Sequence, residues 1–195
     1  DAISDDAATF VEPLAAALHI AEDVDLAQHR NVLVAGDGKL GLLCAHALAL
    51  HGCCVTVAGR HPARAALLPK NATFAAGWLE AAPTAPVGAF DLAVDATGNA
   101  DVLPRLLPLV RPRGTIVLKT TTERPTAADL SLLVVNELRL IGSRCGRFAP
   151  AIDALSRGLV PVESLITARY PLAEAKAAFA HAGTKGTLKV LLQIA

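Results

Sequence analysis

The chain has 195 residues; 53% of them are hydrophobic, only 4% are aromatic, and 18 basic side chains balance 18 acidic ones. This balance argues against nucleic acid or an anionic membrane surface as a partner, and no uninterrupted apolar stretch is long enough to cross a bilayer. One domain with an aliphatic core fits this length, whereas two full domains would be crowded.

The first part of the chain predicts a helix. Its first six residues include three aspartates and do not form a signal peptide, so we expect a soluble, cytoplasmic protein. Apolar positions recur with helical spacing over residues 6–24. Because proline lacks an amide hydrogen, the regular helix is expected to begin at Val11 or Glu12, which places Pro13 in its first turn.

Residues 31–64 form a strand, a glycine-rich turn, a helix and a second strand in sequence. Asn31–Ala35 is a short apolar run rich in branched residues, as expected of a buried parallel strand. It stops at Gly36-Asp-Gly-Lys-Leu-Gly41, which matches G-x-G-x-x-G. Helical spacing then runs over residues 40–50, and a second apolar strand follows at residues 55–58. This order is typical of a dinucleotide-binding unit.

Each glycine of the motif has a physical role in this interpretation. Gly36 permits the sharp turn out of the strand, Gly38 lets a pyrophosphate approach the backbone, and Gly41 lets the helix pack closely. The unpaired amides at the helix N-terminus would face the phosphates. The alternative is a structural glycine turn in another kind of α/β protein.

The end of the second strand indicates which dinucleotide is preferred. Proteins that bind NAD(H) usually have an acidic residue here, because a carboxylate accepts hydrogen bonds from the ribose hydroxyls. This chain has Gly59 at that point, followed by Arg60, His61 and, one turn later, Arg64. Guanidinium groups attract a 2′-phosphate, so we expect NADP(H) to be preferred over NAD(H), and an aspartate in place of Gly59 to shift the preference toward NAD(H). The alternative is that both arginines lie on a solvated helix start.

The rest of the chain continues the alternation of strands and helices. Strands are expected at residues 72–74 (an edge strand), 90–95, 115–119, 138–141 and 189–194, and helices at residues 65–68, 102–109, 130–135, 148–157 and 172–181. Prolines predict a loop at residues 82–86, a glycine-containing turn is expected at residues 112–114, and a polar loop at residues 120–125. The predicted fold class is therefore α/β, a doubly wound parallel sheet of about six strands in the order 3-2-1-4-5-6, between two layers of helices.

The cysteines and histidines predict neither a disulfide framework nor a metal site. None of the cysteines belongs to a C-x-x-C pair; they are Cys44, Cys53, Cys54 and Cys145. Cys44 is expected in the core, while Cys53 and Cys54 should point in opposite directions if they begin a strand. His19 and His46 lie on apolar helix faces, and we interpret both as packing residues.

Several stretches together carry a family resemblance. They are residues 11–19, with the run Val-Glu-Pro-Leu-Ala; the glycine motif and its continuation to residue 43; residues 91–98, which end in Ala96-Thr97-Gly98; and residues 113–117, 142–143, 170–175 and 186–190. On these stretches the whole chain resembles the cofactor-binding part of the medium-chain dehydrogenase/reductase superfamily, the zinc-type alcohol dehydrogenases and their relatives. The resemblance implies one Rossmann domain over residues 1–195.

With the glycine motif, this resemblance implies a set of cofactor contacts. Residues 91–98 would meet the adenosine and ribose, and the strands at residues 113–117 and 142–143 would lie near the nicotinamide. The expected cofactor-binding residues are Gly36, Gly38, Lys39, Leu40, Gly41, Gly59, Arg60, His61, Arg64, Ala96, Thr97, Gly98, Lys119, Thr120, Ser143 and Lys189.

Members of this superfamily begin with a catalytic domain that supplies the cysteine and histidine ligands of a catalytic zinc. No such domain is expected in this chain, so its catalytic residues are unknown and zinc is not expected in it. Glu12 stands where some members place a glutamate near the zinc, but one carboxylate cannot hold a catalytic zinc. Residues 1–28 are interpreted as a leading helix and linker, and residues 166–195 as a C-terminal helix and strand that would contact the catalytic domain.

Two functions fit these observations. The first is the NADP(H)-binding domain of an oxidoreductase that transfers hydride between nicotinamide and an alcohol or carbonyl substrate. The second is a non-catalytic dinucleotide-binding module. A methyltransferase on a similar sheet is a third reading, but it would need an acidic residue near Gly59. The apolar residues 130–141 could pair two copies in a homodimer.

Overall fold

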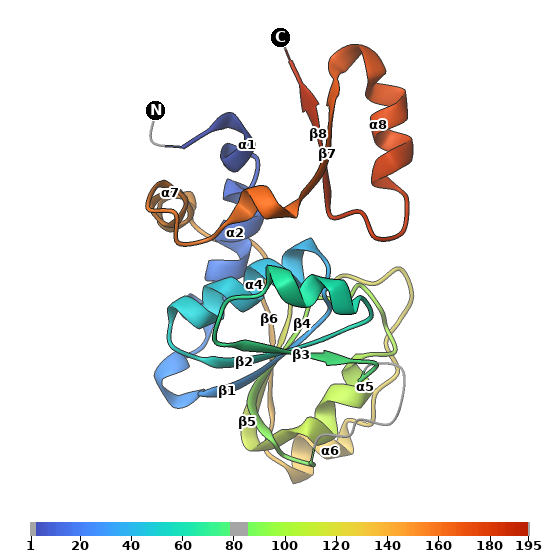
Figure 1. Cartoon of the computed structure of the whole chain (residues 1–195). Coiled ribbons are helices and arrows are strands. Elements are labelled where there is room, and N and C mark those ends of the chain that lie inside the picture. Colours follow the sequence, from blue (N-terminus) through green and yellow to red (C-terminus); the bar gives the residue numbers. More distant parts are fainter. Residues whose placement is uncertain (1–2, 79–85, 195) are drawn as a thin grey trace.

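The computed structural model describes residues 3–78 and 86–194, and its main feature is a six-stranded sheet (Figure 1). The strands lie in the order β3-β2-β1-β4-β5-β6, and every neighbouring pair is parallel. The predicted fold class and strand order are therefore confirmed, with β3 at one edge as expected. The bounds are β1 (Asn31–Ala35), β2 (Cys54–Gly59), β3 (Ala72–Ala76), β4 (Phe90–Asp95), β5 (Val110–Leu118) and β6 (Arg139–Gly142).

Helices cover both faces of this sheet. Val32 and Val34 of β1 pack in one cluster with residues of helices α2, α4 and α7, whereas Leu33 and Ala35 pack in a second cluster with α5. Because alternate side chains of a strand point to opposite faces, a strand covered on both sides must be apolar where it is covered, as β1 is from Val32 to Ala35. The α-helices are α1 (Asp5–Ala8), α2 (Val11–Leu18), α3 (Ile20–Asp23), α4 (Lys39–Leu50), α5 (Leu103–Leu106), α6 (Ser131–Val135), α7 (Phe148–Ser156) and α8 (Ala175–Ala182).

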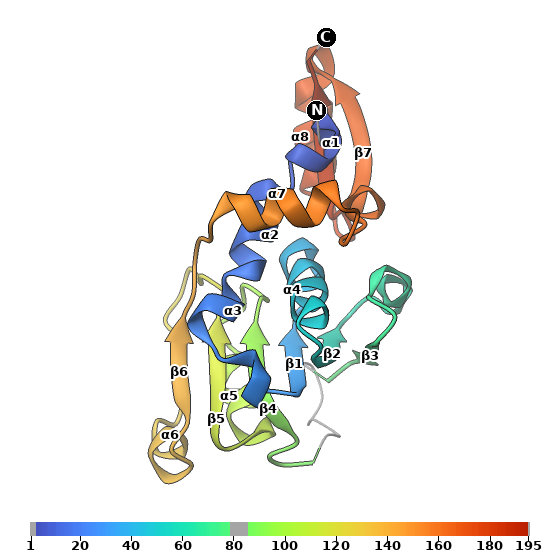
Figure 2. The same ribbon diagram turned by 90° about the vertical axis from the view of Figure 1, so that its left-hand side faces the viewer.

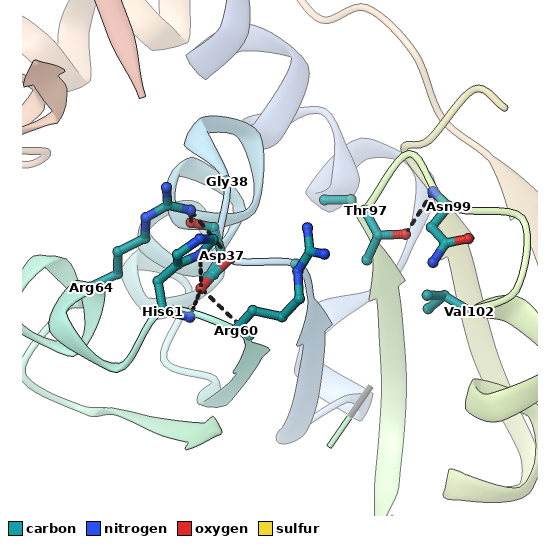
Figure 3. A pocket seen from close by; sticks show the side chains of 11 residues that line it. Asp37, Gly38, Arg60, His61, Arg64, Thr97, Asn99 and Val102 are labelled. Carbon is teal, nitrogen blue, oxygen red and sulfur yellow. Dashed lines mark hydrogen bonds and ion pairs between the residues drawn. The ribbon is translucent and has the colours of Figure 1, made fainter. Parts of the chain in front are cut away.

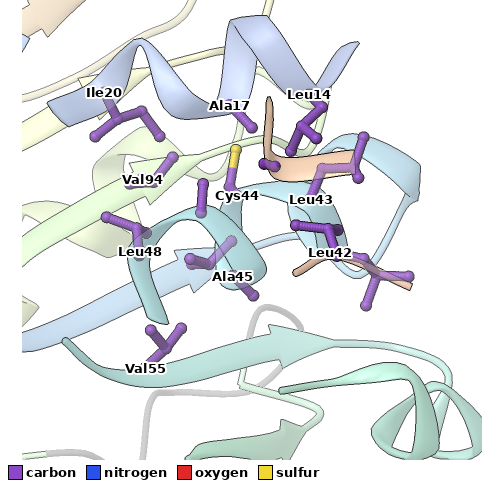
Figure 4. Close-up of a cluster of buried hydrophobic side chains, with 14 of the residues drawn as sticks. Leu14, Ala17, Ile20, Leu42, Leu43, Cys44, Ala45, Leu48, Val55 and Val94 are labelled. Atoms are coloured by element: carbon purple, nitrogen blue, oxygen red, sulfur yellow. The ribbon is translucent and has the colours of Figure 1, made fainter. Parts of the chain in front are cut away.

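Small side chains lie where α2 and α4 meet beside the sheet (Figure 4). Ala17 of α2 and Cys44 of α4 are both fully buried among the leucines of the two helices. This burial raises the pKa of the Cys44 thiol to about 12. The core position of Cys44 is thus confirmed, and so are the opposite directions of Cys53, which is buried, and Cys54, which is exposed.

The N-terminal helix is divided into α1, α2 and α3, where the apolar spacing predicts a single helix over residues 6–24. Pro13 lies in the first turn of α2, as predicted. Because Pro13 has no amide hydrogen, it cannot donate to the carbonyl of Thr9, as a continuous helix would require. The Nζ of Lys189 donates a hydrogen bond to that carbonyl instead, at 2.7 Å.

Other elements also differ from their expected form: the helix expected at residues 65–68 is part of the 3-10 helix η2 (Pro62–Leu67). Strand β5 begins at Val110 and runs through residues 112–114, which were expected to form a turn; the pairing of β4 with β5 shifts register there, and Arg113 has a positive φ of 62°. The helix expected at residues 102–109 is split between α5 and the 3-10 helix η3 (Leu107–Leu109), each with a proline near its start. Most of the loop expected at residues 82–86 lies outside the described residues.

The last part of the chain forms a small separate unit, which stands beyond the main sheet in Figures 1 and 2. Strands β7 (Ile166–Pro171) and β8 (Lys189–Gln193) pair in parallel in a sheet of their own, and α8 packs beside them. The strand expected at residues 189–194 is β8, whereas β7 was not predicted. Among the described residues, no helix is long and apolar enough to span a membrane.

Candidate functional site

A pocket of about 200 Å³ opens at the carboxyl ends of β1, β2 and β4 (Figure 3). Ala35 pairs with Ala58 on one side and with Asp95 on the other, so the segments that follow these three strands start next to each other. In an open parallel sheet, ligands bind at the carboxyl ends of the strands, at the point where the strand order reverses. The pocket is lined by Gly36, Asp37, Gly38, Gly59, Arg60, His61, Arg64, Ala96, Thr97, Asn99 and Val102.

The glycine motif shapes the floor of the pocket. Gly36 has a φ of 107°, and a Cβ atom built on it would lie 2.9 Å from the carbonyl oxygen of Ala96. A Cβ atom on Gly41 would lie 1.9 Å from the carbonyl oxygen of Gly36, so only glycine lets α4 pack this closely on the turn. Gly38 is different: it precedes the first residue of α4, and nothing lies within 4 Å of its Cβ position. Space is therefore open at the amino end of α4.

The sequence analysis missed three residues that line this pocket, Asp37, Asn99 and Val102, and Asp37, the second residue of the motif, has the most contacts of the three. Its side chain is only 7% exposed. Its Oδ2 accepts hydrogen bonds from the backbone amides of Arg60, at 3.0 Å, and His61, at 2.7 Å, and lies 3.0 Å from the His61 Nδ1. A Cβ atom on Gly59 would lie 2.5 Å from the Asp37 Cγ. The Asp37 carboxylate thus fills the space in which a side chain of residue 59 would begin.

The two arginines of the pocket have different surroundings (Figure 3). One Arg64 nitrogen donates to the Asp37 carbonyl at 2.8 Å and lies 3.3 Å from the Asp37 Oδ1, while the other donates to the Gly186 carbonyl at 3.0 Å. The Arg64 side chain is therefore only 11% exposed. Arg60 is exposed, and its guanidinium has no hydrogen bond or ion pair with any of the described residues; it extends away from Asp37 toward the Thr97 side of the pocket.

The turn after β4 forms the opposite wall. The buried Asp95 accepts hydrogen bonds from the backbone amide of Thr97, at 3.0 Å, and from its hydroxyl, at 2.7 Å. Burial raises the pKa of the Asp95 carboxyl, and the two bonds from Thr97 oppose this shift in part. The Gly98 amide donates to the hydroxyl of Thr120, which ties this turn to the loop after β5.

Other expected contact residues do not line this pocket. The Nζ of Lys119 donates to the hydroxyl of Ser143 at 2.8 Å, and burial lowers the pKa of this lysine. The Nζ of Lys189 is held by the Thr9 carbonyl and lies 4.7 Å from the centre of the Phe10 ring. Lys39 and Leu40 begin α4 without lining the pocket. The structure therefore brings together the predicted residues of β1, β2 and β4, and places those of β5, β6 and β8 elsewhere.

No group of three metal-ligating side chains is present in the described part of the chain, and Glu12 is exposed. His46 is buried, as predicted, with its Nε2 2.9 Å from the Leu67 carbonyl oxygen, and burial lowers its pKa. His19 is not a simple packing residue: its ring lies 3.0 Å from the Glu22 carboxylate and 3.5 Å from that of Asp23. Glu22 and Asp23 follow His19 at i+3 and i+4, which are the positions that helical spacing places beside its ring.

This arrangement can hold two anionic groups. The first amides of an α-helix lack partners within the helix, so the open space beside Gly38 suits a phosphate. The guanidinium of Arg60 suits a second anion in the same pocket.

The comparison with known families is specific over almost the whole chain. The sequence profile of the family described as glucose dehydrogenase C-terminus matches residues 6–194. Among curated proteins, the sorbitol dehydrogenase of Bombyx mori is 22% identical over 197 residues, which cover 94% of this chain and 57% of that protein. The L-idonate 5-dehydrogenase (NAD(P)(+)) of Escherichia coli K12 is 26% identical over 185 residues, which cover 90% and 53%. The chain spans about half the length of these relatives.

Solved structures show the same fold. The L-idonate 5-dehydrogenase of Escherichia coli superposes with a TM-score of 0.86 at 24% identity, over 98% of this chain and 58% of that one. A zinc-binding dehydrogenase of Sinorhizobium meliloti 1021, described as putative and solved bound to NADP, superposes with a TM-score of 0.84 at 23% identity, over 95% and 58%. An Escherichia coli CFT073 alcohol dehydrogenase solved with NADH gives a TM-score of 0.82 at 24% identity.

Proposed function

Because the chain belongs to the glucose dehydrogenase C-terminus family, the cofactor-binding part of zinc-type alcohol dehydrogenases, we propose that its pocket binds NADP(H) in preference to NAD(H). The observation that carries this preference is the Arg60 guanidinium, which has no side-chain partner among the described residues and lies beside Gly59, a position without a carboxylate. A 2′-phosphate carries about two negative charges, which such a guanidinium would attract. Relatives and neighbours are described with NAD(P)(+), NADP and NADH, which supports a nicotinamide dinucleotide and leaves the choice between the two to this local chemistry.

The residues of the pocket fit such a cofactor. In the proposed complex, the amides at the start of α4 hold the pyrophosphate in the open space beside Gly38. Arg60 faces the ribose phosphate, and the turn of Ala96, Thr97 and Gly98 borders the adenosine side. Because Gly36 and Gly41 have no side chains, the turn and the start of α4 pack closely and leave room for the pyrophosphate.

We further propose that the pocket serves an oxidoreductase acting on alcohol or carbonyl groups. A nicotinamide cofactor supplies the hydride acceptor or donor for such a reaction. This chain's own residues bind and orient the cofactor, and the catalytic groups are proposed to come from a preceding domain. The dehydrogenases among the matched relatives support this reading over that of an inert binding module.

We propose that residues 1–195 form one Rossmann domain. Its C-terminal part, residues 166–195, is proposed to contact the preceding catalytic domain. Support comes from apolar side chains that the rest of this chain leaves uncovered on the C-terminal unit, where Phe179 is 74% and Ile194 is 81% exposed. An exposed apolar surface of this kind marks a contact region.

A homodimer is proposed to form at the other edge of the main sheet. The edge strand β6 has no neighbour on its outer side among the described strands, and Val134 and Val135 of the nearby α6 are 78% and 77% exposed. Unpaired strand edges readily pair with another chain. Sedimentation at several concentrations should show a dimer, and a monomer at every concentration would contradict this proposal.

Calorimetric titration of the chain with NADP⁺ and NAD⁺ tests the cofactor assignment directly. We expect NADP⁺ to bind at least about tenfold more tightly, a difference of about 1.4 kcal/mol. Equal affinities would contradict the proposed preference, and the absence of binding by either would contradict the site.

A further inference from the structure

The two arginines that the sequence places in one basic cluster are in different states. Arg64 is paired with Asp37 and the Gly186 carbonyl and is only 11% exposed. Arg60 has no side-chain partner among the described residues and lies on the pocket. What separates them is the Asp37 carboxylate, which binds the Arg64 side chain but only the backbone of Arg60.

We propose that Asp37 is a positioning residue for the 2′-phosphate: it fixes the chain after β2 so that Arg60 alone faces this group, and it holds Arg64 back as a structural partner. This inference rests on the proposed function, because it names how the same pocket selects its cofactor. It concerns a residue of the glycine motif that contacts neither the pyrophosphate nor the phosphate in the proposed complex.

The geometry explains how one carboxylate can do this. Its Oδ2 accepts from two successive backbone amides, those of Arg60 and His61, at 3.0 and 2.7 Å. Two adjacent amides bound to one oxygen fix the local direction of the chain, and this sets where the next side chains leave the backbone. Charge-assisted hydrogen bonds of this kind are about twice as strong as neutral ones.

The absence of a side chain at Gly59 is required for this arrangement of Asp37. A Cβ atom there would lie 2.5 Å from both the Cβ and the Cγ of Asp37, so the carboxylate can reach the two amides only because residue 59 has no side chain. The side chain of Asp37 thus occupies the space that an acidic side chain at position 59 would need. For this reason the glycine at the end of β2 and the aspartate in the glycine motif depend on each other.

Asp37 also has an effect that would lower the affinity for NADP⁺. A carboxylate in the pocket repels a 2′-phosphate, and on that ground its removal would improve NADP⁺ binding. The Arg64 guanidinium opposes this effect, because one of its nitrogens lies 3.3 Å from the Asp37 Oδ1 and its positive charge offsets the negative charge of the carboxylate. We therefore infer that the positioning effect exceeds the repulsion, and the sign of the change in affinity decides between them.

The test uses the 195-residue chain with Asp37→Asn, Arg60→Ala and the double variant, each titrated calorimetrically with NADP⁺ and NAD⁺. Asparagine keeps the size of the side chain but removes its charge, and its single carbonyl oxygen cannot accept from both the two amides and Arg64 as the two carboxylate oxygens do. We expect Asp37→Asn to weaken NADP⁺ about tenfold and NAD⁺ less than threefold. In the Arg60→Ala background the same change should weaken NADP⁺ less than threefold, because the residue through which Asp37 acts is gone.

A merely structural role of Asp37 would weaken both cofactors equally and would persist without Arg60. That outcome, or a gain in NADP⁺ affinity from Asp37→Asn, overturns the inference while the proposed function stands. If instead the unmodified chain binds the two cofactors equally and Arg60→Ala changes nothing, both fail. Asp153→Asn, which removes the same charge from an exposed ion pair on α7, is the matched control and should leave both affinities unchanged.

A second measurement does not depend on how the variant folds. In the unmodified chain the amides of Arg60 and His61 donate to a nearly buried carboxylate, so their hydrogen exchange should be at least about tenfold slower than that of the exposed Glu123 amide, which has no such acceptor among the described residues. Equal exchange rates would show that Asp37 does not hold this segment in solution, and would overturn the inference.

Discussion

Gly59 and Asp37 occupy one space: a Cβ atom on the first would lie 2.5 Å from the Cγ of the second. This contact changes the expected result of Gly59→Asp, which on the sequence alone should simply shift preference toward NAD(H). We expect the variant to be destabilised by about 1–3 kcal/mol, the usual cost of overpacking. It should also bind both cofactors more weakly, since Asp37 must move. Thermal unfolding and calorimetry check this, and an unchanged melting temperature with tighter NAD⁺ binding would contradict it.

Gly38 and Gly41 offer a matched pair of substitutions within one motif. A methyl group on Gly38 meets no atom within 4 Å, and its φ of −71° is ordinary for alanine, so Gly38→Ala should leave the free energy of unfolding nearly unchanged. It should weaken dinucleotide binding at least about tenfold, because the methyl group enters the space assigned to the pyrophosphate. Titration with NADP⁺ measures this affinity. An unchanged affinity would contradict the proposal that the pyrophosphate binds at the amino end of α4.

Gly41→Ala should behave in the opposite way. Its methyl group would lie 1.9 Å from the Gly36 carbonyl oxygen, and backbone atoms cannot yield as a flexible side chain can. We expect a loss of stability of about 1–3 kcal/mol or more. Chemical denaturation of the two alanine variants side by side provides the measurement, and equal stabilities would contradict the close packing of α4 on the turn.

Arg60→Ala should lower the affinity for NADP⁺ at least about tenfold, equivalent to about 1.4 kcal/mol, and leave NAD⁺ binding almost unaltered. The reason is that Arg60 is the arginine of the pocket without a partner in the described part of the chain. Arg157→Ala, which removes the same charge from an exposed i,i+4 pair on α7, is the control. Equal losses of NADP⁺ affinity in both variants would indicate a general charge effect and no specific contact.

Asp95→Asn should make the protein's stability less dependent on pH. Burial raises the pKa of the Asp95 carboxyl in the folded chain, so the folded state binds its proton more readily than the unfolded state does. The stability that this group contributes is therefore fully present below its unfolded pKa of about 4 and is lost as pH rises through the higher folded pKa. Asparagine does not titrate and can still accept both hydrogen bonds from Thr97.

The measurement is urea unfolding of both proteins at several values between pH 4 and pH 7. Relative to the unmodified chain, Asp95→Asn should become more stable as pH rises across this range. Parallel curves for the two proteins would show that the Asp95 carboxyl titrates alike in the folded and unfolded states.

The sheet could be predicted because its strongest signals are local. Strand β1 is apolar from Val32 to Ala35 and the three glycines follow directly, so strand, turn and helix start can be read from about twenty residues. The order of the strands then follows from the way doubly wound folds are built. Strand β7 has a weaker signal, because Ile166, Ala168 and Tyr170 alternate with other residues over a short run and are only half-buried in a two-stranded sheet.

The roles of Asp37 and Arg64 could not be predicted for a different reason. Asp37 and the amides it binds are 23 and 24 residues apart, and the Arg64 contact with Gly186 spans 122 residues. Sequence spacing shows that arginines are present near the end of β2, but their partners depend on how the strands lie side by side. The acidic residue in the motif, opposite a glycine at the end of β2, was a visible signal whose meaning required the register of β1 and β2.

The hydrogen bond from Arg64 to Gly186 joins the nucleotide pocket to the connection that leads into β8. The main sheet and the C-terminal unit therefore share a restraint. If the small C-terminal unit frays on heating while the six-stranded sheet remains intact, Arg64 loses one of its two anchors before any strand of that sheet separates. The pocket would then lose its order at a lower temperature than the core, so that the ability to hold a ligand would disappear first and the secondary structure later.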